Sequence, residues 1–327
     1  MRRNKWFRTG LLGALAGLWL AGVAVRADDK AAIAQANKFV QRGNEFTEKE
    51  SYARAKAEYG KALKVFQKHV DAMYNLAVVC ERLGQAPEAL ATYQRYLEIR
   101  PQDADVWNQV GVLHDRQGQH QEARAAYEKA LAINPDFGRA HHNLGVLLQE
   151  AGDFPQAEQH LKRFVALEET AGRRTGDAYY SLGVFYLQRE QPKQAKALLQ
   201  QAVDTDPSHP LYNNALGDVY LVEQKPETAE VYYKKAIEKD AQCVVAYSGL
   251  GDVYSKLGRT PEAVASYGKA LALRPSYAVV HYKLGRVCEK TQPAEAIKHF
   301  EKYLSSGKNL TFADEAAARL TVLKALK

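Results

Sequence analysis

Two adjacent histidines and two aspartates are the residues of this sequence best placed to do chemistry. His141 and His142 are candidate metal ligands, and Asp218 and Asp252 are candidates for a catalytic or cofactor-binding pair. Adjacent residues of a helix point about 100° apart, however, so His141 and His142 cannot easily bind one ion. No His-Glu-x-x-His, Cys-x-x-Cys, Gly-x-Ser-x-Gly or phosphate-binding glycine motif occurs. We therefore expect packing roles for the histidines, and no enzyme activity, cofactor or metal.

These candidate residues belong to a sequence that repeats itself every 34 residues. One small residue of each repeat marks the register: Gly43, Ala77, Gly111, Gly145, Gly183, Gly217, Gly251 and Gly285. Every step is 34 residues except the step from Gly145 to Gly183, which is 38. A fixed period of this length predicts a stack of similar supersecondary units, here eight repeats that start at residues 36, 70, 104, 138, 176, 210, 244 and 278.

Within each repeat the apolar positions predict two amphipathic helices, A and B. Positions 4, 7, 8 and 11 share one helical face, as do positions 20, 24 and 27. Repeat 8 lacks one residue in the turn between its two helices, and with that deletion allowed for, position 20 is always Ala and position 24 is always Tyr, Leu or Phe. We expect the small residues at positions 8 and 20 to let the helices approach closely, with the large side chains beside them. Glycine at position 15 is expected to end helix A in four repeats, at Gly84, Gly118, Gly152 and Gly258.

The pattern of repeat 7 resembles the tetratricopeptide repeat. It consists of Tyr247, Leu250-Gly251, Tyr254, Ala263, Tyr267, Ala270 and Pro275. The resemblance covers roughly residues 36–310. It implies an all-α fold, a right-handed α-α superhelix (solenoid) of eight tetratricopeptide repeats with a C-terminal capping helix.

The same register divides the chain into segments. A lead-in to the first helix is expected at 28–35, repeats 1–4 at 36–171, an insertion at 172–175, repeats 5–8 at 176–310 and the capping helix, with Thr311 as its N-cap, at 311–327. The insertion either lengthens helix B of repeat 4 and adds a short loop, or bends the array between two halves.

Residues 1–27 have the composition of a secretory signal peptide. Four basic residues precede an uncharged run from Thr9 to Val25, and small residues follow it. We expect cleavage before Asp28 and a periplasmic or secreted protein with no membrane span. The alternative is an uncleaved segment, residues 9–25, that anchors the chain in the inner membrane.

Charge and cysteine content exclude some classes of protein. Residues 1–27 contain five basic groups and no acidic group, so the rest of the chain carries +2 of the formal +7. No concentrated basic region remains, and we expect no binding of nucleic acid. The three cysteines, Cys80, Cys243 and Cys288, are widely spaced, and we expect them to be unpaired.

The resemblance implies a binding surface as well as a fold. In tetratricopeptide arrays, positions 2, 5, 6, 9, 12 and 13 of helix A line the concave surface that binds ligands. Repeats 5–7 carry apolar side chains and two aspartates at these positions: Tyr180, Val184, Leu187, Leu211, Asp218, Leu221, Val222, Val245 and Asp252. An apolar strip rimmed by charge predicts a protein-binding groove. The alternative is that these side chains pack between neighbouring A helices.

The expected function is that of a non-catalytic scaffold or adaptor in the cell envelope, which binds segments of partner proteins in the groove. Two alternatives remain open. One is a membrane-tethered assembly factor with an uncleaved anchor, and the other is an enzyme or carrier of a metal or cofactor. The partner and the oligomeric state do not follow from the sequence.

Overall fold

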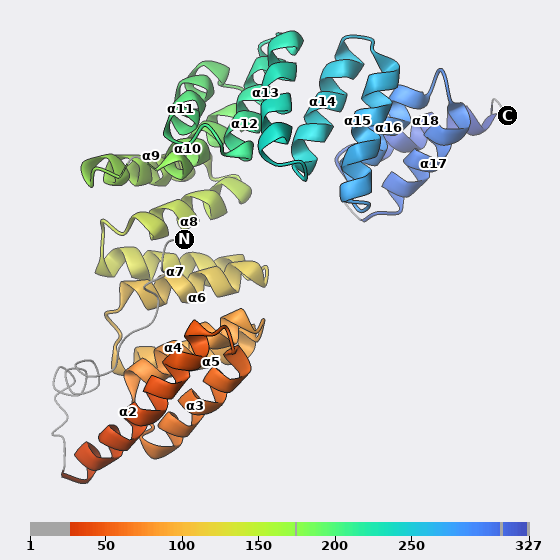
Figure 1. Cartoon of the computed structure of the whole chain (residues 1–327). Coiled ribbons are helices and arrows are strands. Elements are labelled where there is room, and N and C mark those ends of the chain that lie inside the picture. Colours follow the sequence, from red (N-terminus) through yellow and green to blue (C-terminus); the bar gives the residue numbers. More distant parts are fainter. Residues whose placement is uncertain (1–26, 174, 308–309, 326–327) are drawn as a thin grey trace. The chain divides into compact units, whose positions relative to one another are not determined.

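The computed structural model describes residues 27–173, 175–307 and 310–325, which form 17 α-helices and no strand (Figure 1). The first eight helices are α2 (Ala27–Glu48), α3 (Tyr52–Val65), α4 (Val70–Arg82), α5 (Ala86–Ile99), α6 (Ala104–Arg116), α7 (His120–Ile133), α8 (Gly138–Glu150) and α9 (Phe154–Thr170). The others are α10 (Gly176–Gln188), α11 (Pro192–Thr205), α12 (Pro210–Val222), α13 (Pro226–Lys239), α14 (Val244–Lys256), α15 (Thr260–Leu273), α16 (Ala278–Cys288), α17 (Pro293–Leu304) and α18 (Ala313–Ala325).

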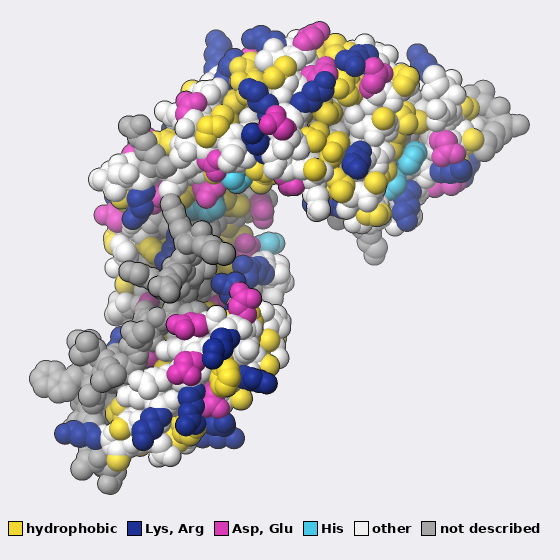
Figure 2. All heavy atoms as spheres, viewed as in Figure 1, with side chains coloured by type: hydrophobic (Ala, Val, Ile, Leu, Met, Phe, Trp, Pro, Cys, Tyr) yellow, Lys and Arg dark blue, Asp and Glu magenta, His cyan; other side chains and the backbone are white. Residues whose placement is uncertain are grey.

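The helices follow the 34-residue register. The even-numbered helices from α2 to α16 are the A helices of the eight repeats, and the odd-numbered helices from α3 to α17 are the B helices. In repeats 2–8 the A helix begins at the first residue of the repeat. Lys, Arg, Asp and Glu side chains lie interspersed with apolar ones on the visible surface (Figure 2), in agreement with the balanced charge of the repeats.

The chain departs from this regular pattern at three places. Helix α2 begins at Ala27, so the expected lead-in is helical, and its Ile33 is buried. Helix α9 has 17 residues where α7 and α11 have 14, so part of the insertion after repeat 4 lengthens a B helix. Helix α18 begins at Ala313, so Phe312 and not Thr311 directly precedes it. The Phe312 ring stacks on Tyr282 at 4.5 Å, which places the start of α18.

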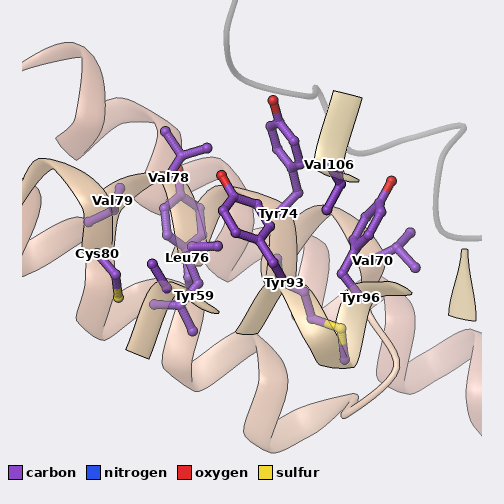
Figure 3. Close-up of a cluster of buried hydrophobic side chains, with 14 of the residues drawn as sticks. Tyr59, Val70, Tyr74, Leu76, Val78, Val79, Cys80, Tyr93, Tyr96 and Val106 are labelled. Carbon is purple, nitrogen blue, oxygen red and sulfur yellow. The ribbon is translucent and has the colours of Figure 1, made fainter. Parts of the chain in front are cut away.

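The structure forms two compact bodies, one up to His160 and the other from Leu161 onward. In the N-terminal body the large side chains at positions 5, 24 and 27 of repeat 2 meet. Tyr74, Tyr93 and Tyr96 are buried, and the Tyr74 ring centroid lies 6.2 Å from that of Tyr93 and 6.1 Å from that of Tyr96 (Figure 3). Cys80 is buried in the same cluster, and burial raises its pKa to about 11. All three cysteines are free and buried.

Helices A and B of one repeat pack through the residues that the sequence singled out. Alanine at position 20 is fully buried in all eight repeats. The large side chain at position 24 lies over the glycine at position 8. A Cβ atom added to Gly111 would lie 2.5 Å from Cε1 of Tyr127, which is closer than real Cβ atoms come to a ring. A methyl group at Gly111 would therefore force the Tyr127 ring to shift, which favours glycine here, although repeat 2 has Ala77 at the same position.

The turn between helices A and B uses a left-handed residue at position 15. The four predicted glycines occupy it with φ between 71° and 81°, which confirms their role as C-caps: Gly84, Gly118, Gly152 and Gly258. In repeats 1, 5 and 6 the same position holds Glu50, Glu190 and Gln224, with φ of 55°, 56° and 61°. The backbone of these three residues adopts a left-handed conformation that is unfavourable for a residue with a Cβ atom.

In the C-terminal body the A helices form a continuous layer. Helix α12 contacts both α10 and α14, and α14 contacts α16, while the B helices α11, α13 and α15 each pack against the A helix that follows. Helix α18 packs on α17 and buries Ala316 and Leu323. Among the residues that the structure describes, no helix is both long and apolar enough to cross a membrane. The expected signal peptide lies outside the described residues except for Ala27.

Candidate protein-binding face

The candidate site is the outer side of the A-helix layer in the C-terminal body. We call it the A-helix face and define it by positions 2, 5, 6, 9, 12 and 13 of α10, α12, α14 and α16. The nine residues predicted from the sequence lie on three of these helices: Tyr180, Val184 and Leu187 on α10, Leu211, Asp218, Leu221 and Val222 on α12, and Val245 and Asp252 on α14.

The apolar members of this set differ in exposure. Leu211 and Val222 are 39% and 47% exposed. Leu221 and Val245 are half-buried and pack against the hydrophobic core of the body. Tyr180, Val184 and Leu187 are also half-buried. The two interpretations of the sequence therefore hold for different residues: packing describes Leu221 and Val245, while Leu211 and Val222 are available to a ligand.

Leu211, Asp218 and Val222 form a single stripe along α12. Seven and eleven residues are close to two and three full turns of a helix, so these side chains leave α12 in nearly the same direction. At 1.5 Å per residue, the two apolar ends of the stripe are about 16 Å apart. A carboxylate thus lies between two exposed apolar side chains.

Asp218 is half-buried and its charge is only partly compensated. Its Oδ1 accepts a hydrogen bond of 2.6 Å from the Tyr233 hydroxyl, and its Oδ2 accepts one of 3.1 Å from Nδ2 of Asn214. Burial, aided by the nearby charge of Asp252, raises the pKa of Asp218 to about 6, while the hydrogen bond from Tyr233 and the charge of Lys283 oppose the shift. A further hydrogen-bond donor or a cation beside the Asp218 carboxylate would stabilise its charged form.

Asn214 presents a second acceptor beside this carboxylate. Its Nδ2 is used by Asp218, which fixes the orientation of the amide. Its Oδ1 is buried, and within the described residues no donor reaches it. A buried acceptor without a partner costs about 1–3 kcal/mol, so an incoming N–H group at this point would be stabilised. Asn214 and Asp218 therefore both favour a hydrogen-bond donor at the middle of the stripe.

Asp252 is in a different state, because it already has a cationic partner. Its Oδ1 accepts a hydrogen bond of 2.6 Å from Tyr267, and its Oδ2 lies 2.6 Å from Nζ of Lys283 on α16. The face thus holds an aspartate on each of two adjacent helices, and only one of them is paired with a lysine.

The pairing of position 9 with the hydroxyl of Tyr at position 24 was not anticipated from the sequence. It occurs three times, as Tyr59 to Asn44 at 2.7 Å, Tyr233 to Asp218 and Tyr267 to Asp252. A signal was present, because each repeat with Asn or Asp at position 9 has Tyr at position 24. The two aspartates thus also hold helices A and B together.

His141, Asp218 and Asp252, which the sequence singled out, contact side chains of the B helices. No group of three or more His, Cys, Asp or Glu side chains suited to a metal ion exists in the described part of the chain. Nδ1 of His141 lies 2.8 Å from Nδ1 of His160 on α9. Asp218 and Asp252 bind different tyrosines and do not share a hydrogen bond.

Comparison with protein families gives the same assignment over most of the repeats. Four family models described as the tetratricopeptide repeat or TPR repeat match residues 70–136, 116–171, 180–242 and 251–292, which together make up more than half of the chain. No curated protein matches the sequence.

Solved structures share the fold at low sequence identity. A chain of the APC/C hetero-tetramer Cut9-Hcn1 superposes with a TM-score of 0.65 and 19% sequence identity. The match covers 95% of the present chain but only 62% of that longer chain. A tetratricopeptide repeat protein from Parabacteroides merdae gives a TM-score of 0.64 and 17% identity over 77% of this chain and 98% of that one. The pilF protein of Pseudomonas aeruginosa gives 0.52 and 20% over 68% and 97%. These likenesses confirm the expected all-helical solenoid of stacked repeats.

Proposed function

We propose that this chain, which belongs to the tetratricopeptide repeat family, is a non-catalytic scaffold that binds a segment of a partner protein along α12. Tetratricopeptide repeat proteins are protein-interaction scaffolds, and the proposal adds a place and a ligand chemistry. The observation that carries it is the stripe on α12, where the undercompensated Asp218 and the unsatisfied Asn214 lie between exposed Leu211 and Val222.

The stripe favours a ligand with a Lys or Arg side chain between two apolar residues. The cation would donate to the half-buried Asp218 carboxylate, while the apolar residues would cover Leu211 and Val222. A span of about 16 Å corresponds to about five residues of an extended strand at 3.3 Å per residue, so a short extended segment suffices. Asp252 is less able to hold the cation, because Lys283 already occupies one of its oxygens.

The expected affinity is moderate. Complete burial of a Leu or Val side chain contributes about 1.5–3 kcal/mol, and side chains that are half exposed in the free protein gain about half of that. Because association itself has an entropic cost, the contact with Asp218 must supply much of the remainder. We expect a micromolar complex whose rate of formation falls with increasing salt.

Two variants of matched chemistry test the site. The double substitution Leu211→Asp with Val222→Asp should abolish binding to a panel of synthetic peptides that carry one basic residue between two apolar ones. The control is Val231→Asp on α13, because Val231 is 50% exposed, as Val222 nearly is, but lies on a B helix. Retention of binding by the double variant, or an equal loss in the control, would refute the assignment. Both variants should unfold at the wild-type urea concentration, since neither removes a buried side chain.

The location of the protein is a second part of the proposal. The basic and apolar order of residues 1–27 supports export and cleavage before Asp28, so the scaffold would act in the periplasm or outside the cell. N-terminal sequencing of the protein from its native host tests this. A chain recovered from the membrane fraction with residues 9–25 intact would instead support the tethered assembly factor.

A further inference from the structure

Two pairs of histidines have the same geometry in repeats 4 and 8. In repeat 4, Nδ1 of His141 on α8 lies 2.8 Å from Nδ1 of His160 on α9. In repeat 8, Nδ1 of His281 on α16 lies 3.0 Å from Nδ1 of His299 on α17. The ring planes are tilted by 37° and 33°, with centroids 5.1 Å and 5.2 Å apart. Each pair therefore joins helix A to helix B by a hydrogen bond between two Nδ1 atoms, and it brings two potential metal ligands together.

The first ring of each pair is held by the backbone of the preceding turn. Nε2 of His141 lies 2.9 Å from the carbonyl oxygen of Pro135, and Nε2 of His281 lies 3.1 Å from that of Pro275. A carbonyl oxygen only accepts, so Nε2 must carry the proton in both rings, and in the neutral ring Nδ1 carries the lone pair. A histidine that donates one ring N–H to a backbone carbonyl is in the usual arrangement of a metal ligand.

The two pairs occur together at defined repeat positions. His141 and His281 occupy position 4 of their repeats, and His160 and His299 occupy position 23. No other repeat has His at either position, so four of the nine histidines of the chain are used in this way. Packing alone does not require the combination, because the other repeats fill the same two positions with side chains of other kinds.

The surroundings of the two pairs are also alike. Burial and the partner His141 lower the pKa of His160, and Glu128 partly opposes that shift. Burial and the partner His281 lower the pKa of His299, and Glu295 opposes it. The charges of Glu128 and Glu295 thus act on the second ring of each pair. All four histidines are half-buried, and histidine side chains reach the surface over α16 and α17 (Figure 2).

We propose that each histidine pair binds one divalent transition-metal ion of the Cu²⁺ or Ni²⁺ class through its two Nδ1 atoms, so that the chain has two equivalent metal sites. Water completes the coordination of each ion, because no third protein ligand is in place within the described residues. These two sites are independent of the peptide-binding stripe on α12.

The distance between the nitrogens is that of a hydrogen bond, and it is also compatible with one class of metal. At bond lengths of about 2.0 Å, two neighbouring ligands of a square-planar ion are about 2.8 Å apart, while two ligands of a tetrahedral ion are about 3.3 Å apart. The observed 2.8 Å and 3.0 Å fit the square-planar geometry that Cu²⁺ and Ni²⁺ prefer. On binding, His160 and His299 move their single proton from Nδ1 to Nε2, and both rings turn their lone pairs toward the ion. No net proton is released.

The test is titration of the full-length purified protein with CuCl₂ and NiCl₂ at pH 7.5, followed by calorimetry. We expect two equivalents of metal with similar affinity. His160→Gln and His299→Gln should each leave one equivalent, and the double variant should leave none. The control, His120→Gln, alters an exposed histidine on α7 and should keep both equivalents.

A second measurement does not depend on the variants and covers the case in which they fail to fold. The electron paramagnetic resonance spectrum of the Cu²⁺-loaded wild-type protein should show hyperfine coupling to two nitrogen nuclei per copper. Two equivalents with two-nitrogen coupling would establish the sites. Fewer than two equivalents, coupling to a single nitrogen, or full binding by the double variant would overturn the proposal.

Discussion

Replacement of Asp218 by Asn should make the protein more stable at neutral pH while weakening ligand binding. The substitution keeps the shape of the side chain and removes its charge. The hydrogen bond from Tyr233 should survive, because repeat 1 has the same contact with an amide, from Tyr59 to Asn44 at 2.7 Å. A rotation of the Asn214 amide would let its buried Oδ1 accept a hydrogen bond from the new amide group.

The size of the gain follows from the pKa of the aspartate. Burial raises the pKa of Asp218 from 3.8 to about 6, so between these values the folded state binds more protons than the unfolded state. The free energy of unfolding therefore falls as pH rises from about 4 to 6, and the full loss persists above pH 6. Two pKa units correspond to about 3 kcal/mol at most. We expect Asp218→Asn to add about 1–3 kcal/mol at pH 7.5 and nothing at pH 4.

Urea denaturation followed by circular dichroism at pH 4, 5.5 and 7.5 measures this difference. Asp204→Asn is the control, because it makes the same chemical change at an exposed aspartate of α11 and should shift stability by less than about 0.5 kcal/mol. A variant that is less stable than the wild type at pH 7.5, or a gain that does not change with pH, would refute the reasoning. The same variant should bind the peptide panel more weakly, since the binding stripe has lost the carboxylate that pairs with the basic residue of the peptide.

Three further substitution or labelling experiments test the fold. Gln224→Gly should stabilise the protein by about 1 kcal/mol in urea denaturation, because Gln224 has a φ of 61°, and an unchanged midpoint would contradict the argument. Gly251→Ala should destabilise by about 1–3 kcal/mol, because the new methyl group would overlap the Tyr267 ring, whereas Gly268→Ala on α15 meets open space and should not destabilise. Thiol titration of the denatured protein should count three groups, Cys80, Cys243 and Cys288, and titration of the native protein should count few, since burial raises the pKa of every thiol. A count of one after denaturation would reveal a disulfide.

The helical architecture was predictable because the repeat is a local pattern. The starts of the A helices, the buried alanine at position 20 and the left-handed glycine at position 15 each depend on residues a few positions apart, which the sequence displays directly. The start of α18 was less accessible. Helix α18 starts directly after Phe312, which stacks on Tyr282, 30 residues earlier in the chain, and a capping preference of Thr311 does not display this contact.

The sequence predicted which residues belong to the A-helix face but not which of their side chains are exposed. Its nine residues lie on the expected helices, but their exposure depends on the neighbouring helix. Leu221 and Val222 are adjacent and chemically similar, yet the first packs on the core and the second is 47% exposed. The partner of His141 was also not foreseen, because His160 is 19 residues away and on another helix.

The order of the helix contacts has a consequence for how the chain folds. Within each body, the helices that pack together are neighbours or next neighbours along the chain. The loops that must close to form them are short, so little chain entropy is lost before the first favourable contacts are made. Several hairpins can therefore nucleate independently and recruit the adjoining repeats, and an emerging chain can begin to fold before its last repeats have been synthesised.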